Sequence, residues 1–212
     1  MFFIHKMGWP FQKVLYPTLT WRVPTTEKKI YLTFDDGPIP EITPYVLNIL
    51  DQFDAKATFF CVGDNIRKHP QVFERVVVRG HSIGNHTFNH IVGWNTSLQR
   101  YLDNTMLCQE WIEKFYLTKR KRPLFRPPHG RITRKQIKAL QEKYEIVMWE
   151  VLSGDFEAYL KKETCLEKSI QHAQAGSVIV FHDSLKAKER LYYALPHFLE
   201  HFRNKGFTFE KL

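Results

Sequence analysis

Short runs of apolar and β-branched residues recur along the chain and alternate with longer segments whose apolar residues return every three or four positions. The short runs have the length and composition of strands buried on both faces, and the longer segments have the period of amphipathic helices. The strand-like runs are Ile30–Phe34, Ala57–Val62, Ser82–Gly84, Leu124–Phe125, Ile146–Leu152, Val178–Phe181 and Phe207–Phe209. This alternation predicts a β/α fold with a parallel sheet.

Several of the helical segments carry recognisable end signals. Thr43 before Pro44 predicts an N-cap followed by a proline at the first helical position, and Thr133 predicts a second N-cap. Gly206 marks the end of the last helix. The residues expected to face inward are Val46, Leu50 and Phe53 in the first helix, Ile137, Leu140 and Tyr144 in the second, and Leu191, Leu195, Phe198 and Phe202 in the last.

About seven strands alternating with about six helices favour a closed or nearly closed parallel barrel, because each helix then covers the outside while both strand faces are buried. An open doubly wound sheet is the alternative. We expect one domain over residues 29–212, since a chain of 212 residues suits a single core. Residues 1–28 show no clear period, and we expect an arm that packs on this domain through Trp9, Phe11, Leu15, Tyr16 and Trp21.

Polar residues follow many of the predicted strands. In a parallel barrel the carboxyl ends of the strands lie on one face, so residues that are far apart in sequence converge there. This convergence predicts an active site on that face. The residues concerned are Asp35 and Asp36, His86 and His90, Arg126, Asp155, and His182.

The segment His86-Thr87-Phe88-Asn89-His90 spaces two imidazoles at i and i+4. On a helical turn both rings would lie on one face and could reach one ion. A lone histidine is more often a packed core residue. Two histidines at this spacing, with a carboxylate from elsewhere, predict a metal site that leaves coordination positions open for water and substrate.

The segment Thr33–Pro38 places two adjacent carboxylates at a strand end and then turns the chain with Gly37 and Pro38. An ordinary turn that caps the next segment is one interpretation. Because adjacent side chains leave a strand in different directions, the pair also allows one acid to bind a cation while the other faces a substrate.

The segment Arg126-Pro127-Pro128-His129-Gly130 predicts a stiff loop, because proline fixes φ and glycine permits a tight turn. It is either a rigid connection with a surface arginine or a functional loop. In the second case Arg126 orients a carboxylate, and the backbone N–H of His129 points at a developing oxyanion.

His182 ends the apolar run Val178–Phe181 and is followed by Asp183 and Ser184. It is either a capped structural residue or a general acid. A general acid needs a carboxylate that stabilises its protonated form, and Asp155 is the candidate.

Taken in order, TFDDG (33–37), HTFNH (86–90), RPPHG (126–130), GDF (154–156) and IVFH (179–182) resemble the five motifs of the NodB-type polysaccharide deacetylases, carbohydrate esterase family four. The resemblance extends from about Lys29 to the C-terminus. It implies a distorted (β/α) barrel and a divalent metal, zinc or cobalt, held by Asp36, His86 and His90. It also implies that Asp35 is the general base, that Arg126 holds Asp35, and that His182, partnered by Asp155, is the general acid.

The chain departs from the family pattern in three motifs. Leu152 stands where the fourth motif begins with aspartate, and Phe156 replaces its tryptophan. His129 stands where the third motif ends in tyrosine or phenylalanine, and Ile179 replaces a leucine expected in the acetyl pocket. We expect His129, Phe156 and Ile179 to contact substrate, so these changes bear on specificity and leave the implied metal ligands intact.

The chain carries a formal net charge of +9, which makes an anionic glycan, a nucleic acid or an acidic membrane surface electrostatically plausible partners. The basic run Lys119–Arg122 is typical of a solvated loop. No nucleic-acid-binding module is recognisable, so we expect no nucleic acid partner. Cys61, Cys108 and Cys165 show no metal-binding spacing and are expected to be reduced core residues.

The sequence therefore favours an enzyme that removes N-acetyl or O-acetyl groups from a carbohydrate such as an oligo- or polysaccharide containing N-acetylglucosamine. The alternative is a carbohydrate-binding protein that kept the fold and lost turnover. Polar residues interrupt the apolar start of the chain, so we expect no membrane-spanning segment or signal peptide and a cytoplasmic location.

Overall fold

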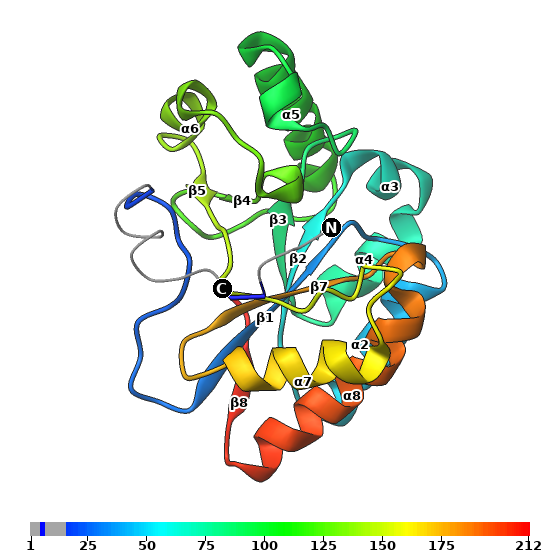
Figure 1. The fold of residues 1–212 in the computed structure, drawn as a ribbon. Coiled ribbons are helices and arrows are strands. Elements are labelled where there is room, and N and C mark those ends of the chain that lie inside the picture. Colours follow the sequence, from blue (N-terminus) through cyan, green and yellow to red (C-terminus); the bar gives the residue numbers. More distant parts are fainter. Residues whose placement is uncertain (1–4, 7–15) are drawn as a thin grey trace.

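The computed structural model describes residues 5–6 and 16–212, and its centre is a curved sheet of parallel strands (Figure 1). The strand order is β5-β4-β3-β2-β1-β7-β6, and β8 pairs with β1 outside this path. The strands are β1 (Lys29–Asp35), β2 (Thr58–Cys61), β3 (Ser82–Asn85), β4 (Leu124–Phe125), β5 (Glu145–Ile146), β6 (Val151–Leu152), β7 (Val178–His182) and β8 (Thr208–Glu210).

Strand β1 lies at the middle of the sheet and sets the register of its neighbours. Along one edge, β1 pairs with β7 over Tyr31–Asp35, which places Asp35 beside His182. Along the other edge, β8 pairs with the start of β1 and β2 pairs with its end. The register therefore brings the ends of the first and seventh strands to the same level.

The predicted strand Ile146–Leu152 is two short strands, and this part of the prediction is wrong. Residues 147–150 leave the ladder and connect β5 at one edge of the sheet to β6 at the other. The N–H of Val147 donates to Phe125, and the N–H of Glu150 donates to Val178. One segment thus bridges both edges and curls the sheet into the distorted (β/α) barrel that was predicted, rather than an open sheet.

Helices cover the outside of the sheet, and α7 and α8 pack side by side against one part of it (Figure 1). The α-helices are α2 (Ile42–Gln52), α3 (Gly63–Lys68), α4 (Pro70–Val78), α5 (Leu98–Glu113), α6 (Arg134–Leu140), α7 (Lys162–His172) and α8 (Lys188–Asn204). Short 3₁₀ turns occur at η1 (Gly93–Asn95), η2 (Pro128–Gly130) and η3 (Leu185–Ala187).

Alternate residues of each strand face two different cores, as the pleat requires. Phe59 packs in the core between sheet and helices, whereas its neighbour Phe60 packs in the core enclosed by the curled sheet. In β7, Ile179 lies in the outer core and Val180 in the inner one. Both cores consist of buried apolar side chains, whereas the candidate site residues lie at the strand ends and in their loops.

One of the two predicted N-caps is confirmed. Thr133 accepts a hydrogen bond from the backbone N–H of Gln136, whose side chain bonds back to Thr133 in a capping box. The prediction for Thr43 is wrong, because helix α2 begins at Ile42 with Glu41 as N-cap. The Thr43 side chain is buried and binds elsewhere.

The segment preceding β1 lies partly on the inner core. Trp21 is buried there, and its indole N–H donates to the carbonyl of Tyr16. The predicted contacts of Trp9, Phe11 and Leu15 fall outside the described residues, and the division of the chain at residue 29 stays a prediction. All three cysteines are buried and unpaired, as expected. No helix within the described residues is long and apolar enough to span a bilayer.

Candidate active site

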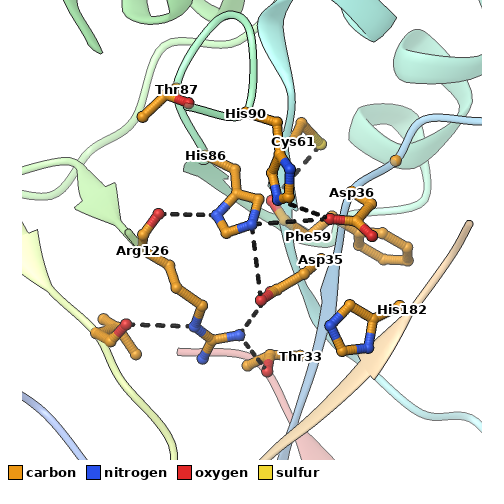
Figure 2. Close-up of polar contacts among 12 residues, drawn as sticks. Thr33, Asp35, Asp36, Phe59, Cys61, His86, Thr87, His90, Arg126 and His182 are labelled. Carbon is orange, nitrogen blue, oxygen red and sulfur yellow. Dashed lines mark hydrogen bonds and ion pairs between the residues drawn. The ribbon is translucent and has the colours of Figure 1, made fainter. Parts of the chain in front are cut away.

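Asp36, His86 and His90 form a compact cluster at the carboxyl ends of β1 and β3 (Figure 2). One oxygen or nitrogen of each lies within 4.8 Å of those of the other two. Nε2 of His90 is 3.2 Å from Oδ1 of Asp36, and Nε2 of His86 is 3.9 Å from the same oxygen. Two imidazoles and one carboxylate at this separation are able to hold a divalent metal ion.

The backbone that presents this cluster adopts a conformation that most residues avoid. Asp36, Thr87 and His90 have positive φ angles of 85°, 61° and 53°. Such angles cost free energy outside glycine and concentrate at functional sites. The expected helical turn over 86–90 is therefore wrong: a strand end and an irregular loop bring the two imidazoles together.

Arg126 is fully buried and connects the cluster to the neighbouring acid (Figure 2). Its Nη1 donates to Oδ1 of Asp35 at 2.7 Å and to the hydroxyl of Thr33 at 2.7 Å. The remaining donors, Nη2 and Nε, reach the carbonyls of Met148 and Val147. Because these partners fix the planar guanidinium on both sides, Asp35 is held in one orientation.

The backbone of Arg126 also orients a candidate metal ligand. Nδ1 of His86 lies 2.8 Å from the carbonyl oxygen of Arg126. A carbonyl only accepts, so Nδ1 carries the hydrogen and Nε2 presents its lone pair to the cluster. Burial also lowers the pKa of His86 to about 4, which keeps the ring neutral as a metal ligand must be.

The charge of Asp36 complements the neutral ring of His86. Burial alone would disfavour its ionised form. The hydrogen bond with His90 and the charge of His182 nevertheless hold the pKa of Asp36 well below its usual range. The cluster therefore combines one carboxylate with an imidazole whose lone pair faces it.

His182, at the end of β7, lies across Asp35 from Arg126 (Figure 2). Its Nδ1 donates to Oδ1 of Asp155 at 2.7 Å, which leaves Nε2 for a substrate. Burial works against the charged ring, but the Asp155 carboxylate raises the pKa of His182 to about 9. The ring is thus protonated at neutral pH, as a proton donor requires. Asp155 is fully buried and is the carboxylate that serves His182, while Leu152 is only half-buried and offers no polar atom.

With this arrangement in view, residues 22–147 match the family model described as polysaccharide deacetylase. The chain belongs to the polysaccharide deacetylase family. A peptidoglycan-N-acetylglucosamine deacetylase of Bacillus cereus is 34% identical over 203 residues, covering 93% of each chain. A chitooligosaccharide deacetylase of Azorhizobium caulinodans is 33% identical over 79% of this chain and 80% of its own.

The deacetylase also has a close structural neighbour. The crystal structure of the Bc1960 peptidoglycan N-acetylglucosamine deacetylase in complex with an N-hydroxybenzamide superposes with a TM-score of 0.86. It is 29% identical and is matched over 97% of this chain and 95% of its own. The chain is therefore a carbohydrate deacetylase by family and an enzyme of the hydrolase class, and its fold is that of carbohydrate esterase family four.

The three residues expected to contact substrate lie in different surroundings in this deacetylase: His129 and Phe156 pack against site histidines, and Ile179 does not. His129 is exposed, has a positive φ of 58°, and packs against His90 with 4.7 Å between ring centroids. Phe156 packs edge-on against His182 at 5.0 Å. Ile179 is fully buried in the outer core, on the opposite strand face from His182, so its predicted place in an acetyl pocket is wrong. Val180 shares the face of His182.

Sequence reasoning missed Asp183, although it lies next to His182. Its fully buried carboxylate accepts from the backbone N–H of Gly37 at 3.0 Å and from the Thr43 hydroxyl at 2.5 Å. Burial raises the pKa of Asp183 to about 8. The residue thereby fastens the turn that follows Asp36 to the end of β7. The only sequence signal was a carboxylate adjacent to a site histidine.

Proposed function

We propose that this deacetylase hydrolyses the acetamide of N-acetylglucosamine residues in a peptidoglycan-type glycan, in a metal-dependent reaction. One arrangement carries the proposal. The Asp36, His86 and His90 cluster lies beside an acid held by Arg126 and a histidine held by Asp155. A base, an acid and a set of metal ligands on one strand-end face are the parts that amide hydrolysis needs.

The donor set suits zinc or a similar divalent ion. Asp36 offers a carboxylate oxygen, and His86 and His90 offer ring nitrogens, with the tautomer of His86 fixed by the Arg126 carbonyl. A metal bound there would supply Lewis acidity toward the acetyl carbonyl and lower the pKa of water. Three protein ligands leave coordination positions open for the acetyl carbonyl and the water.

Asp35 is the proposed general base. Its Oδ1 is occupied by Arg126, while Oδ2 lies 3.9 Å from Nε2 of His86 and faces the cluster. That oxygen is positioned to take a proton from a water molecule attacking the acetyl carbon. Arg126 keeps the carboxylate from rotating away during the transfer.

His182 is the proposed general acid, with its Nε2 delivering a proton to the departing sugar nitrogen. The bond to Asp155 holds the ring and its protonated form. The oxyanion that forms during attack needs a donor, and the backbone N–H of His129 makes no hydrogen bond within the described part of the chain. We assign that N–H to the oxyanion.

The substrate class is inferred from the relatives. The Bacillus cereus relative is named for the N-acetylglucosamine of peptidoglycan, and the Azorhizobium relative for chitooligosaccharides. Both substrates present an acetamide on the same sugar. The net charge of +9 favours a glycan that carries acidic groups over a neutral one.

The test is acetate release by metal-loaded protein from a panel of acetylated sugars. The panel should contain chitooligosaccharides, peptidoglycan fragments and an O-acetylated xylan, so that amides and esters are compared. Release from the amides would support the proposal, and preference for the ester would redirect it to O-deacetylation. Silence across the panel would favour the carbohydrate-binding alternative.

A further inference from the structure

Trp94 is a large aromatic side chain that is exposed and yet held in place. Its side chain is 61% exposed, and its indole N–H donates to the carbonyl of Ile132 at 3.2 Å. The Arg131 guanidinium lies 5.5 Å from the ring centroid. Single exposed apolar residues are common, so exposure alone says little. An indole that is fixed at its edge while its surface faces solvent is preorganised to bind a ligand.

The position of Trp94 links it to the active site. It follows the candidate metal ligand His90 by four residues, a stretch that spans at most about 14 Å. The N–H of Gly93 donates to the carbonyl of Arg131 at 3.1 Å, and the Gln136 side chain donates to the carbonyl of Gly93 at 2.9 Å. The loop that carries His90 is thereby fastened to the loop that carries His129.

Because Gly93 has no side chain, the two loops can approach each other closely at this connection. A Cβ at this position would press against the carbonyl oxygen of Arg131 and the amide oxygen of Gln136. Beyond this junction, the rings of His90 and His129 pack together, while Phe156 packs against His182 on the other side of the cluster. Aromatic rings therefore lie on two sides of the candidate metal ligands. Trp94 lies farther along the loop that carries His90.

The charge beside Trp94 indicates the chemistry of the ligand. Within the described part of the chain, Arg131 forms no ion pair with an acidic side chain. The face of an indole attracts the weakly positive C–H groups of a sugar ring, and a guanidinium binds a carboxylate with directional hydrogen bonds. With the guanidinium over the indole ring, the two groups together match a sugar that bears a carboxylate.

We propose that Trp94 and Arg131 form a second sugar-binding site, which binds a carboxylate-bearing sugar next to the one being deacetylated. The proposal rests on the proposed function and narrows its substrate to acidic glycans. The enzyme then binds at least two sugars of the glycan, one at the metal ligands and one on Trp94. A neutral glycan stacks on Trp94 but gains no binding energy from Arg131.

The test compares three substrates of metal-loaded protein. They are a single N-acetylglucosamine glycoside, a neutral N-acetylglucosamine tetrasaccharide, and a tetrasaccharide alternating N-acetylglucosamine with N-acetylmuramic acid whose lactyl carboxylate is free. Trp94→Ala should lower the ratio of kcat/KM for either tetrasaccharide to that for the single sugar by about tenfold, because a stacking contact is lost. Trp94→Phe should restore part of this ratio. Arg131→Gln should lower kcat/KM for the acidic chain about two- to fivefold relative to the neutral chain.

Trp111 on α5 and Lys114, the C-cap of that helix, provide the matched control, since Lys114 lies 3.4 Å over the Trp111 ring, which packs against the outer core. Trp111→Ala and Lys114→Gln should leave both ratios unchanged, and a ratio is insensitive to partial loss of folded protein. An unchanged ratio in Trp94→Ala would overturn the second site, and equal effects of Arg131→Gln on both chains would overturn its acidic specificity. If wild-type protein releases no acetate from any substrate, the proposed function itself fails.

Discussion

Asp155 accepts two hydrogen bonds from His182, one from the ring Nδ1 and one from the backbone N–H, both at 2.7 Å. The first bond sets the protonation of the ring and the second sets its position at the end of β7. A buried carboxylate that makes both contacts couples the geometry of the proposed acid to its pKa.

Asp155→Asn should therefore shift the pH dependence of the reaction. The carboxylate favours the protonated ring, so its removal lowers the pKa of His182, which stands at about 9 in the intact protein. The alkaline limb of the kcat/KM profile should move to lower pH, with a reduced rate and unchanged metal content. An alkaline limb that stays in place would show that His182 has another partner or is not the acid.

Asp35→Asn should lower kcat by on the order of 10²- to 10⁴-fold, the usual contribution of a general base. The amide keeps the shape of the side chain and can still accept from Arg126, so bound metal should be retained. Metal content by elemental analysis and the thermal unfolding midpoint serve as controls. Turnover near that of the wild type would refute the assignment of Asp35.

Arg126→Lys should lower the free energy of unfolding by about 3 kcal/mol and abolish most activity. The fully buried guanidinium makes contacts to four residues that an ammonium group cannot reproduce. Arg120→Lys is the control, because its pair with Glu145 is partly exposed and should contribute less than about 1 kcal/mol. Urea denaturation of both variants measures the difference. Equal losses would mean that the Arg126 contacts add no special stability.

Gly37→Ala should weaken metal binding as well as stability. A Cβ on Gly37 would overlap the Asp183 carboxylate, which fastens the turn after Asp36. Zinc titration by calorimetry should show lower affinity. Gly80→Ala is a useful comparison, because a Cβ at Gly80 would meet open space, although the backbone there has a φ of +76°. That variant should lose about 1 kcal/mol of stability and retain its zinc affinity.

The sequence predicted most of the barrel because its strands are short apolar runs and its helices keep their period. The prediction failed where tertiary contacts override the local sequence pattern. The run Ile146–Leu152 is apolar throughout, yet its middle must leave the ladder to bridge the two edges of the curled sheet. Thr43 has the composition of an N-cap, but the buried Asp183 carboxylate takes its hydroxyl.

The candidate site was predictable for a related reason. Strand ends on one face bring distant polar residues together whatever their local conformation, so His86 and His90 converge although the loop between them is not helical. Which face of a strand a side chain occupies is a finer matter. The predicted strand ends at Phe181, whereas β7 continues to His182, so alternation along it places Val180 rather than Ile179 on the face of His182.

Metal dependence of acetate release is the most direct test of the whole account. Protein stripped with a chelator, and shown by elemental analysis to be metal-free, should release no acetate from an N-acetylglucosamine oligosaccharide. Added zinc or cobalt should restore release in proportion to the metal bound, up to one ion per chain, and His86→Ala or His90→Ala should prevent both binding and recovery. Full activity in protein proven free of metal would contradict the account.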